Sequence, residues 1–212
     1  MNGHLMSYTK RKFLVSRRYG VSLWGHAKDP VQERKYPPGQ HGIMGYSKKS
    51  DFAKQLEAKQ KLKSHYDIRE KQFRNIYQLA TKKKGDRIEN FISLLETRLD
   101  VLVYRAKFAP TIFAAKQLVS HGHFLLNNKK IDIPSVRVVA GSTVQLKKQG
   151  MFENPSIVTA IEASDRSVPE YIETNDEKRS FKLLRLPALV DVPYAFVVDN
   201  VFINHIIAFY SH

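Results

Sequence analysis

The sequence predicts an α+β protein: a basic, extended N-terminal arm, then helices, then a compact module of two helices packed on a small, mainly antiparallel sheet. Three observations predict this class. Residues 1–49 collect Gly, Pro and basic residues without a sustained apolar period. From residue 50 apolar residues recur at helical spacing, and after residue 122 they form short strand-like runs separated by Asn and Gly. Helices followed by strands are typical of α+β folds.

Three helices are predicted between residues 50 and 96. Residues 50–51 are Ser and Asp, which are favoured N-caps for the first helix. The second helix has apolar residues at the i, i+3, i+4 and i+7 positions of 73–80. It ends at residues 82–85, three lysines and a glycine, which suit a helix C-terminus. Asp86 with Glu89 forms a capping-box pattern at the start of the third helix.

The module begins with a short helix at 99–106, which Pro110 separates from the next one. Thr111 is a favoured N-cap for a second helix that runs to His121. Gly122 is then placed to end that helix. The sequence therefore predicts two consecutive helices before the first strand.

The strands are predicted from short apolar runs between turn residues. The first is 123–127, and it ends in a tight turn at Asn127 and Asn128. The other predicted elements are strands at 136–139 and 143–147, a helix at 155–163, and a hairpin of 171–174 and 180–186. The apolar tail IIAFYSH fits either a strand or a helix, because its β-branched residues and its helical spacing conflict.

The charge of the chain points to a polyanionic partner. Lys and Arg number 35 against 20 Asp and Glu, which gives +15. Residues 1–90 carry 21 basic and 8 acidic side chains, residues 91–148 carry 9 and 3, and residues 149–212 carry 5 and 9. The excess cations thus lie in the first 148 residues, and nucleic acid is the commonest partner for such a chain. No apolar run approaches the ~20 residues that span a bilayer, so no membrane partner is expected.

The pair His121 and His123 raises the question of a metal or an acid–base site. The two side chains diverge if Gly122 ends a helix, and no third ligand is near in sequence. Zinc sites usually need at least three protein ligands. The absence of cysteine also excludes thiolate ligands and thiol nucleophiles. We therefore expect no metal and no cofactor.

An RNA-modifying enzyme is the sharper alternative. Arg98-Leu99-Asp100 resembles the motif of pseudouridine synthases in which the aspartate is the nucleophile. That motif continues into a glycine turn, whereas this chain continues as a helix. Asp100 is expected to pair with Arg98 or Arg105 at the helix start, where the dipole favours a carboxylate. No catalytic site is predicted, and the protein is not expected to be an enzyme.

What remains is binding to structured RNA. Lysines contact phosphates, while Gln, Asn, Ser and His donate to phosphates or 2′-hydroxyl groups, which suits RNA that is recognised by shape. Such residues gather where the second module helix meets the following turn, with His121 facing the RNA and His123 lining the sheet. The candidate RNA-binding residues are Arg17, Arg18, Gln40, His41, Lys48, Lys54, Lys61, Lys63, Lys71, Arg74, Arg98, Arg105, Thr111, Lys116, Gln117, Ser120, His121, Asn127, Lys129 and Lys130.

Several stretches resemble a known family. Residues 96–148 resemble the RNA-binding fold named after small-subunit ribosomal protein four. PGQHG at 38–42, SDFAKQLEAKQKLKSHY at 50–66 and LLETRLD at 94–100 resemble that ribosomal protein family itself. The resemblance covers nearly the whole chain, and other carriers of the module lack the arm and the preceding helices.

This resemblance implies a structural constituent of the small ribosomal subunit. Members of the family bind rRNA at a junction in the 5′ domain, nucleate assembly and contribute to translational accuracy. The expected partners are small-subunit rRNA, neighbouring small-subunit ribosomal proteins, and mRNA near its entry region. A pseudouridine synthase-like enzyme and a free-standing RNA chaperone are the alternatives, because both can carry the same module.

The resemblance also implies the domain organisation. The basic arm is 1–49, the helical rRNA-binding domain is 50–96 completed by 190–212, and the inserted RNA-binding module with its sheet extension is 97–189. The apolar tail would then pack back against Phe73, Ile76 and Phe91. Because the arm has no cysteine, the chain resembles the zinc-free type of the family.

The chain departs from the family pattern at a few positions. Lys116 stands where arginine is usual, Lys107 and Asn128 where glycine is common, and Ala208 where an acid is usual. Lysine lacks the planar fork of arginine, so position 116 cannot make a bidentate phosphate contact. GVSLWG at 20–25 resembles the alphaproteobacterial branch. This implies a bacterial cytoplasmic ribosome, with the mitochondrial matrix as the alternative because mitochondria descend from that branch.

Overall fold

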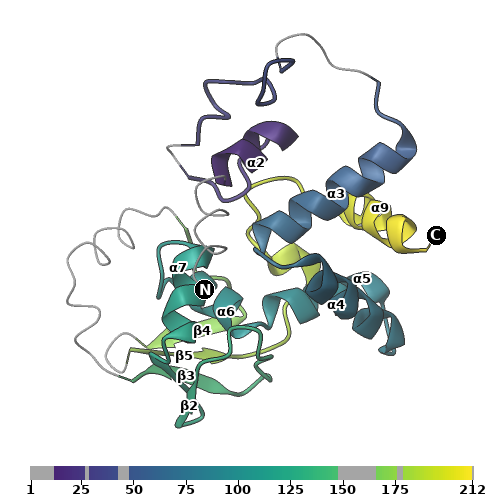
Figure 1. The fold of residues 1–212 in the computed structure, drawn as a ribbon. Coiled ribbons are helices and arrows are strands. Elements are labelled where there is room, and N and C mark those ends of the chain that lie inside the picture. Colours follow the sequence, from purple (N-terminus) through teal and green to yellow (C-terminus); the bar gives the residue numbers. More distant parts are fainter. Residues whose placement is uncertain (1–11, 27–28, 43–47, 148–165, 176–178, 212) are drawn as a thin grey trace. The chain divides into compact units, whose positions relative to one another are not determined.

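The computed structural model describes residues 12–26, 29–42, 48–147, 166–175 and 179–211. The chain forms two compact units, one made of Met1–Glu70 with Tyr194–His212 and the other of Lys71–Pro193. Both ends of the chain belong to the first unit, and the second unit is one continuous segment. The helices and the antiparallel sheet confirm the predicted α+β class (Figure 1).

The first unit contains α2 (Lys12–Tyr19), α3 (Asp51–His65) and α9 (Asn200–Tyr210). Ser50 caps α3 as predicted, because its side chain accepts a hydrogen bond from the amide of Ala53. The tail forms a helix rather than a strand: Asp199 caps it at the amide of Phe202, and its apolar face is buried. α9 packs along α3 (Figure 1).

The sequence predicts an extended arm, but part of the arm forms a helix and contributes buried side chains. After α2, the side chains of Leu23 and Trp24 are buried. The indole of Trp24 donates to the carbonyl of His65 at 3.0 Å, and Nδ1 of His65 lies 2.6 Å from the carbonyl oxygen of Leu23. These contacts join the arm to the end of α3. They depend on a partner some 40 residues along the chain, which no local period can indicate.

The second unit begins with helices and ends with the sheet. Its elements are α4 (Glu70–Lys82), α5 (Arg87–Glu96), α6 (Leu99–Arg105), α7 (Ile112–Ser120), β1 (Phe124–Leu126), β2 (Lys129–Ile131), β3 (Thr143–Leu146), β4 (Ile172–Asn175), β5 (Ser180–Leu183) and the short 3₁₀ helix η2 (Leu189–Asp191). The strands pair antiparallel in the order β2-β1-β3-β5-β4. The helices predicted between residues 70 and 121 and most of the predicted strands are confirmed.

Within this unit, the core of the module lies between the sheet and the two module helices. α6 and α7 lie on the same side of the sheet (Figure 1). Phe108, which follows α6, packs its ring 6.4 Å from that of Phe124 on β1 and 5.5 Å from that of Phe181 on β5. All three side chains are buried. The predicted module of two helices on a small sheet is therefore present.

The predicted strand at 136–139 is wrong. This segment forms only an isolated bridge between Arg137 and Arg98. The amide of Leu99 donates to the carbonyl of Val136 at 2.9 Å, and the amide of Val138 donates to the carbonyl of Thr97 at 2.8 Å. The segment uses its backbone groups to hold the start of α6, so they are not available to a sheet.

Asp86 caps α5 through the amide of Ile88, but Glu89 does not complete a capping box, because its carboxylate accepts from the amide of Leu189. β2 was not predicted: the sequence indicates only a turn in this region. The predicted helix at 155–163 lies outside the described residues. No helix that the structure describes is both long and apolar enough to cross a membrane.

Candidate RNA interface

The end of α7 turns the chain toward the sheet at Gly122. Thr111 begins the helix by accepting a hydrogen bond from the amide of Ala114 at 3.1 Å. His121 is the C-cap, and its amide donates to the carbonyl of Gln117 at 3.0 Å. Gly122 follows with φ +70°, a left-handed conformation that favours glycine. The predicted helix stop is confirmed.

Gly122 also lets a lysine pass close to the turn. A β-carbon added at this glycine would lie 2.7 Å from Cε and 3.5 Å from Nζ of Lys130 on β2. The lysine stem therefore crosses the glycine between His121 and His123, whose ring centres are 5.9 Å apart. The corner of α7 and β1 thus carries two imidazoles and one ammonium group.

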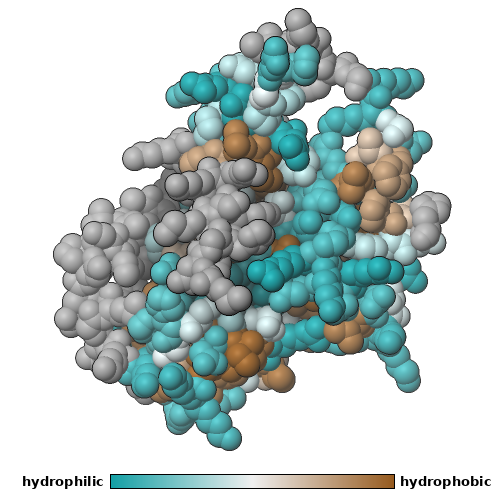
Figure 2. All heavy atoms as spheres, viewed as in Figure 1, coloured by the Kyte–Doolittle hydropathy of each residue, from teal (hydrophilic) through white to brown (hydrophobic). Residues whose placement is uncertain are grey.

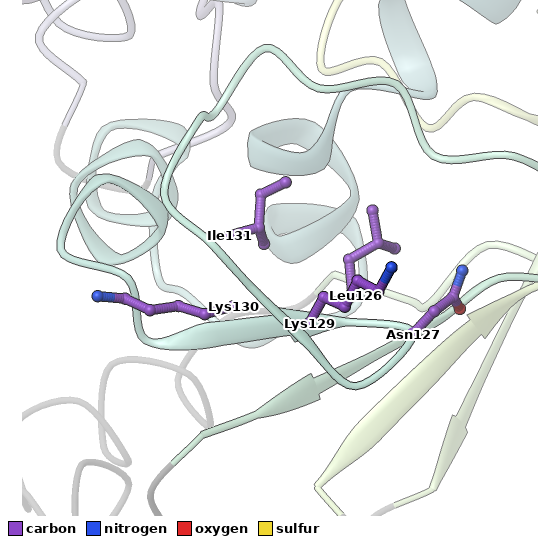
Figure 3. Close-up of a pocket in the computed structure, with 5 residues that line it drawn as sticks. All are labelled: Leu126, Asn127, Lys129, Lys130 and Ile131. Carbon is purple, nitrogen blue, oxygen red and sulfur yellow. The ribbon is translucent and has the colours of Figure 1, made fainter.

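The β1–β2 hairpin forms the next part of this surface. Asn127 and Asn128 both have positive φ, 48° and 66°, as a two-residue hairpin turn requires. The side chain of Asn127 accepts from the amide of Thr143 at 3.0 Å, which ties the turn to β3. Figure 3 shows a shallow pocket in which Leu126 and Ile131 point to the same side while Lys130 extends away from them.

The predicted residues of the module edge are brought together at the surface. Gln117 and Ser120 are exposed on α7, and His121 is exposed at its end. Asn127, Lys129 and Lys130 are exposed at the hairpin. Lys116 is half-buried, and its carbonyl accepts from the hydroxyl of Ser120 at 2.8 Å. The side chains that remain presented to a ligand are mostly hydrogen-bond donors or cations.

Two predicted arginines are instead held inside the second unit. Arg98 pairs with Asp100 through two hydrogen bonds of 3.1 and 2.8 Å, and Arg105 pairs with Glu96 at 3.0 and 2.8 Å. Each guanidinium is about 5% exposed, and both carboxylates are fully buried. Asp100 is therefore the partner of Arg98, as predicted, and not an accessible nucleophile.

These ion pairs change the candidate set. Glu96 also accepts from the hydroxyl of Tyr171 at 2.9 Å, and Arg105 donates to the carbonyl of Pro193 at 3.0 Å. The guanidinium groups of Arg98 and Arg105 are thus committed to the interior. Thr111 is committed to the cap of α7. All three side chains are therefore engaged by partners within the protein.

The remaining candidates fall into two groups. Lys71 and Arg74 are exposed on α4 of the second unit. Those of the first unit are Arg17, Arg18, Gln40, His41, Lys48, Lys54, Lys61 and Lys63. Three of these lysines are partly neutralised by neighbours: Lys54 pairs with Asp51, Lys61 with Glu57 and Lys63 with Glu70, at 2.8, 2.8 and 3.0 Å.

The structure adds candidates that sequence reasoning missed. On α4, Asn75, Gln78 and Lys82 continue the exposed row that begins at Lys71. Their helical spacing could have revealed them. Lys147 follows β3, and its amide donates to the carbonyl of His123 at 2.9 Å. Only the pairing of β1 with β3 brings this lysine to the corner, so no local pattern indicates it.

The surface is largely hydrophilic on the side shown in Figure 2, where apolar side chains form a few small patches. Among the described residues no group of three or more His, Cys, Asp and Glu could hold a metal ion. The geometry therefore presents cations and hydrogen-bond donors on a rigid edge. This arrangement suits a polyanion with fixed shape.

Comparison with known proteins decides the family. The ribosomal protein S4/S9 N-terminal domain matches residues 7–96, and the S4 domain matches residues 97–144. Small ribosomal subunit protein uS4 of Ehrlichia ruminantium (strain Gardel) is 48% identical over 202 residues, which cover 95% of this chain and 98% of that protein. The chain belongs to the uS4 family.

Other uS4 proteins are similarly close. That of Ruegeria sp. (strain TM1040) is 47% identical over 204 residues, covering 96% of this chain and 97% of its own. That of Sinorhizobium fredii (strain NBRC 101917 / NGR234) is 47% identical over 201 residues, covering 94% and 96%. The uS4 family is structural and non-enzymatic. Membership thus favours the ribosomal interpretation over a pseudouridine synthase-like enzyme or a free-standing chaperone.

Proposed function

We propose that this uS4 protein binds small-subunit rRNA directly at a junction in the 5′ domain, nucleates assembly there, and contributes to translational accuracy. The observation that carries the proposal is the edge formed by α7 and the β1–β2 hairpin. There Gln117 on α7, His121 at the C-cap of α7 and Lys130 on β2 present donors and cations on one surface. Family membership supplies the small ribosomal subunit as the assembly.

Recognition at this edge combines two kinds of contact. Lys129 and Lys130 neutralise phosphates and release counterions, which supplies affinity without sequence preference. Gln117 and Asn127 donate hydrogen bonds to phosphate or 2′-hydroxyl groups, whose positions depend on the local shape of the RNA. Because the turn of Asn127 is tied to β3, its amide is held in place before the RNA arrives.

The exposed face of α4 provides a second contact in the same unit. Lys71, Asn75, Gln78 and Lys82 follow one another at i+4, i+3 and i+4, so they form a row along the helix. At 1.5 Å rise per residue this row is about 16 Å long, enough for several successive phosphates. In the first unit, the exposed residues Gln40, His41 and Lys48 of the arm form a separate proposed contact.

We further propose the finer setting of this function. The ribosome is that of a bacterial cytoplasm, a setting suggested by the Ehrlichia, Ruegeria and Sinorhizobium origin of the similar uS4 proteins. Neighbouring small-subunit proteins and mRNA near the entry region are the additional partners. A mitochondrial ribosome is the alternative that localisation of a tagged protein would distinguish.

Footprinting on complete small-subunit rRNA with this protein alone tests the proposal. We expect protection confined to one junction in the 5′ domain. Affinity should fall by about 10³- to 10⁵-fold between 50 and 200 mM salt if 6 to 10 phosphates are contacted. Scattered protection, or an affinity that hardly changes with salt, would contradict the proposal.

A pair of charge-matched variants locates the contact. Lys130→Gln removes one cation from the hairpin and should reduce the slope of log affinity against log salt by about 1. Lys182→Gln removes an exposed cation from β5, outside the proposed edge, and should leave affinity and slope unchanged. Equal effects of the two variants would show that only overall charge matters.

A further inference from the structure

The corner between α7 and β1 holds two histidines as well as lysines. Lysines alone would be enough to bind a phosphate. His121 ends α7, His123 leads into β1, and their ring centres are 5.9 Å apart. Lys130 crosses Gly122 between them, and Lys147 is held beside His123 through the hydrogen bond from its amide. His121 is exposed and His123 is half-buried, so solvent and ligand can reach the pair.

In the free protein, burial and these neighbours oppose protonation of His123. Burial, together with His121 and Lys147, lowers the pKa of His123 below its ordinary value of 6.5. The other charged groups that lie at the corner are Lys130 and Asp132, whose Cβ lies 3.9 Å from a β-carbon built at Gly122. Cations therefore outnumber the single carboxylate among the described residues that border the corner.

We propose that this corner is a binding site for one backbone phosphate of the RNA, and that binding takes up protons from solvent onto His121 and His123. The inference rests on the proposed RNA-binding function and specifies one subsite of it. A phosphate bound between the two imidazoles and the ammonium groups of Lys130 and Lys147 adds negative charge, which offsets the repulsion from the lysines. The charged imidazoles then become favourable, because each can donate a hydrogen bond to the anion.

Gly122 is required for this geometry for two independent reasons. Its φ of +70° would strain any other residue, and a β-carbon would displace the Lys130 stem at 2.7 Å. The glycine therefore stops the helix and also admits the lysine to the anion site. The His-Gly-His sequence acts as one unit rather than as one RNA-facing and one structural histidine.

The consequence is that RNA affinity depends on pH in the range where histidine titrates. Each unit by which the phosphate raises an imidazole pKa corresponds to a tenfold gain in affinity below the free pKa. For the wild-type protein and a transcript of the 5′ domain of small-subunit rRNA, we expect affinity to rise about tenfold from pH 8 to pH 5.5 at constant ionic strength. Titration calorimetry in buffers of different ionisation enthalpy should show net proton uptake.

The variant His121→Gln/His123→Gln tests whether this corner is the source. It keeps hydrogen-bonding side chains but cannot titrate, so most of the pH dependence and of the proton uptake should disappear. The single variant His121→Gln, at an exposed position, should lose about half of the effect and covers the case in which the double variant unfolds. His205→Gln on α9, outside the proposed RNA contacts, should keep the wild-type pH profile.

Two matched measurements separate the possible failures. Lys129→Gln removes a neighbouring cation and no imidazole, so it should weaken binding equally at every pH. If the wild-type affinity does not change with pH, or if the double variant keeps the wild-type slope, this inference is wrong while RNA binding stands. If the wild type binds the 5′ domain transcript at no pH, the proposed function itself fails.

Discussion

The ammonium group of Lys59 lies 4.1 Å from the centre of the Phe209 ring, which ties α3 to the last turn of α9. The same ammonium donates to Glu70 at 2.9 Å, and the hydroxyl of Tyr210 donates to Glu70 at 2.9 Å. The side chain of Lys59 is only 7% exposed. A buried ammonium needs such partners, because an unpaired charge away from water is strongly destabilising. The C-terminal helix is thus held by a specific cluster.

Loss of this lysine should loosen the first unit. We expect Lys59→Ala to lower the free energy of unfolding by about 2 kcal/mol, through the lost cation–π contact and the lost packing of its stem. The single tryptophan, Trp24, is buried in the same unit and reports its unfolding by fluorescence. Lys54→Ala removes an exposed pair with Asp51 and should change stability far less, because water screens that pair. Equal losses in the two variants would contradict the role of the cluster.

The same cluster makes stability depend on acid. Burial alone would raise the pKa of Glu70, but hydrogen bonds from Lys59, Lys63 and Tyr210 outweigh it and lower the pKa from 4.5 to about 2. A carboxyl whose pKa is depressed in the folded state stabilises it fully above the ordinary pKa. This contribution is lost as the pH falls from about 4.5 to about 2. Denaturant unfolding at pH 6 and pH 3 should show the loss in the wild type, and Glu70→Gln should reduce it; an unchanged pH dependence in the variant would refute the assignment.

Backbone strain should appear at Lys107. This residue has φ +62°, a left-handed conformation that costs an ordinary side chain about 1 kcal/mol or more. We expect Lys107→Gly to raise the free energy of unfolding by about 0.5 kcal/mol, after the greater flexibility of the unfolded chain is subtracted. Asn128 has φ +66°, but asparagine tolerates this region, so Asn128→Gly should have a smaller effect. Thermal unfolding of both variants checks the order, and a destabilised Lys107→Gly protein would overturn the argument.

Breaking the buried pair of Glu96 and Arg105 should strongly destabilise the second unit. Glu96→Gln leaves a guanidinium that is 5% exposed without its carboxylate, which typically costs about 3–5 kcal/mol. Glu57→Gln also removes a carboxylate that pairs with lysine, but Glu57 and Lys61 are each 18% exposed and water can replace the contact. Calorimetric unfolding should therefore show a large loss for Glu96→Gln and less than about 1 kcal/mol for Glu57→Gln. Similar losses in both variants would contradict the importance of burial.

The features that the sequence predicted correctly are those set by neighbouring residues. Ser50 and Thr111 cap helices because their oxygens reach amides three residues later. Gly122 and the Asn127-Asn128 turn adopt positive φ because these residue types tolerate it. Short-range chemistry of this kind acts wherever the segment lies in the fold. The RNA-facing edge of the module could therefore be predicted in outline from residues 111–130.

The features that the sequence did not predict depend on partners far along the chain. The 136–139 segment holds the start of α6 instead of pairing in the sheet, and Trp24 docks on His65. The sequence predicts that Arg98 and Arg105 contact RNA, but in the fold each arginine is buried against a carboxylate. The sequence alone does not distinguish a charged side chain that faces solvent from one that pairs with a buried partner. Only the packed structure could separate the two.

By itself, therefore, the sequence determined the α+β class, the helix caps, the hairpin turn and the polyanionic character of the partner. The tertiary structure decided which cations face outward, and it brought Lys130 and Lys147 to the two histidines. The physical reason is that caps and turns are closed by atoms within a few residues of one another. A charge cluster, in contrast, is assembled by strand pairing, here of β1 with β2 and β3, and exists only once the sheet has formed.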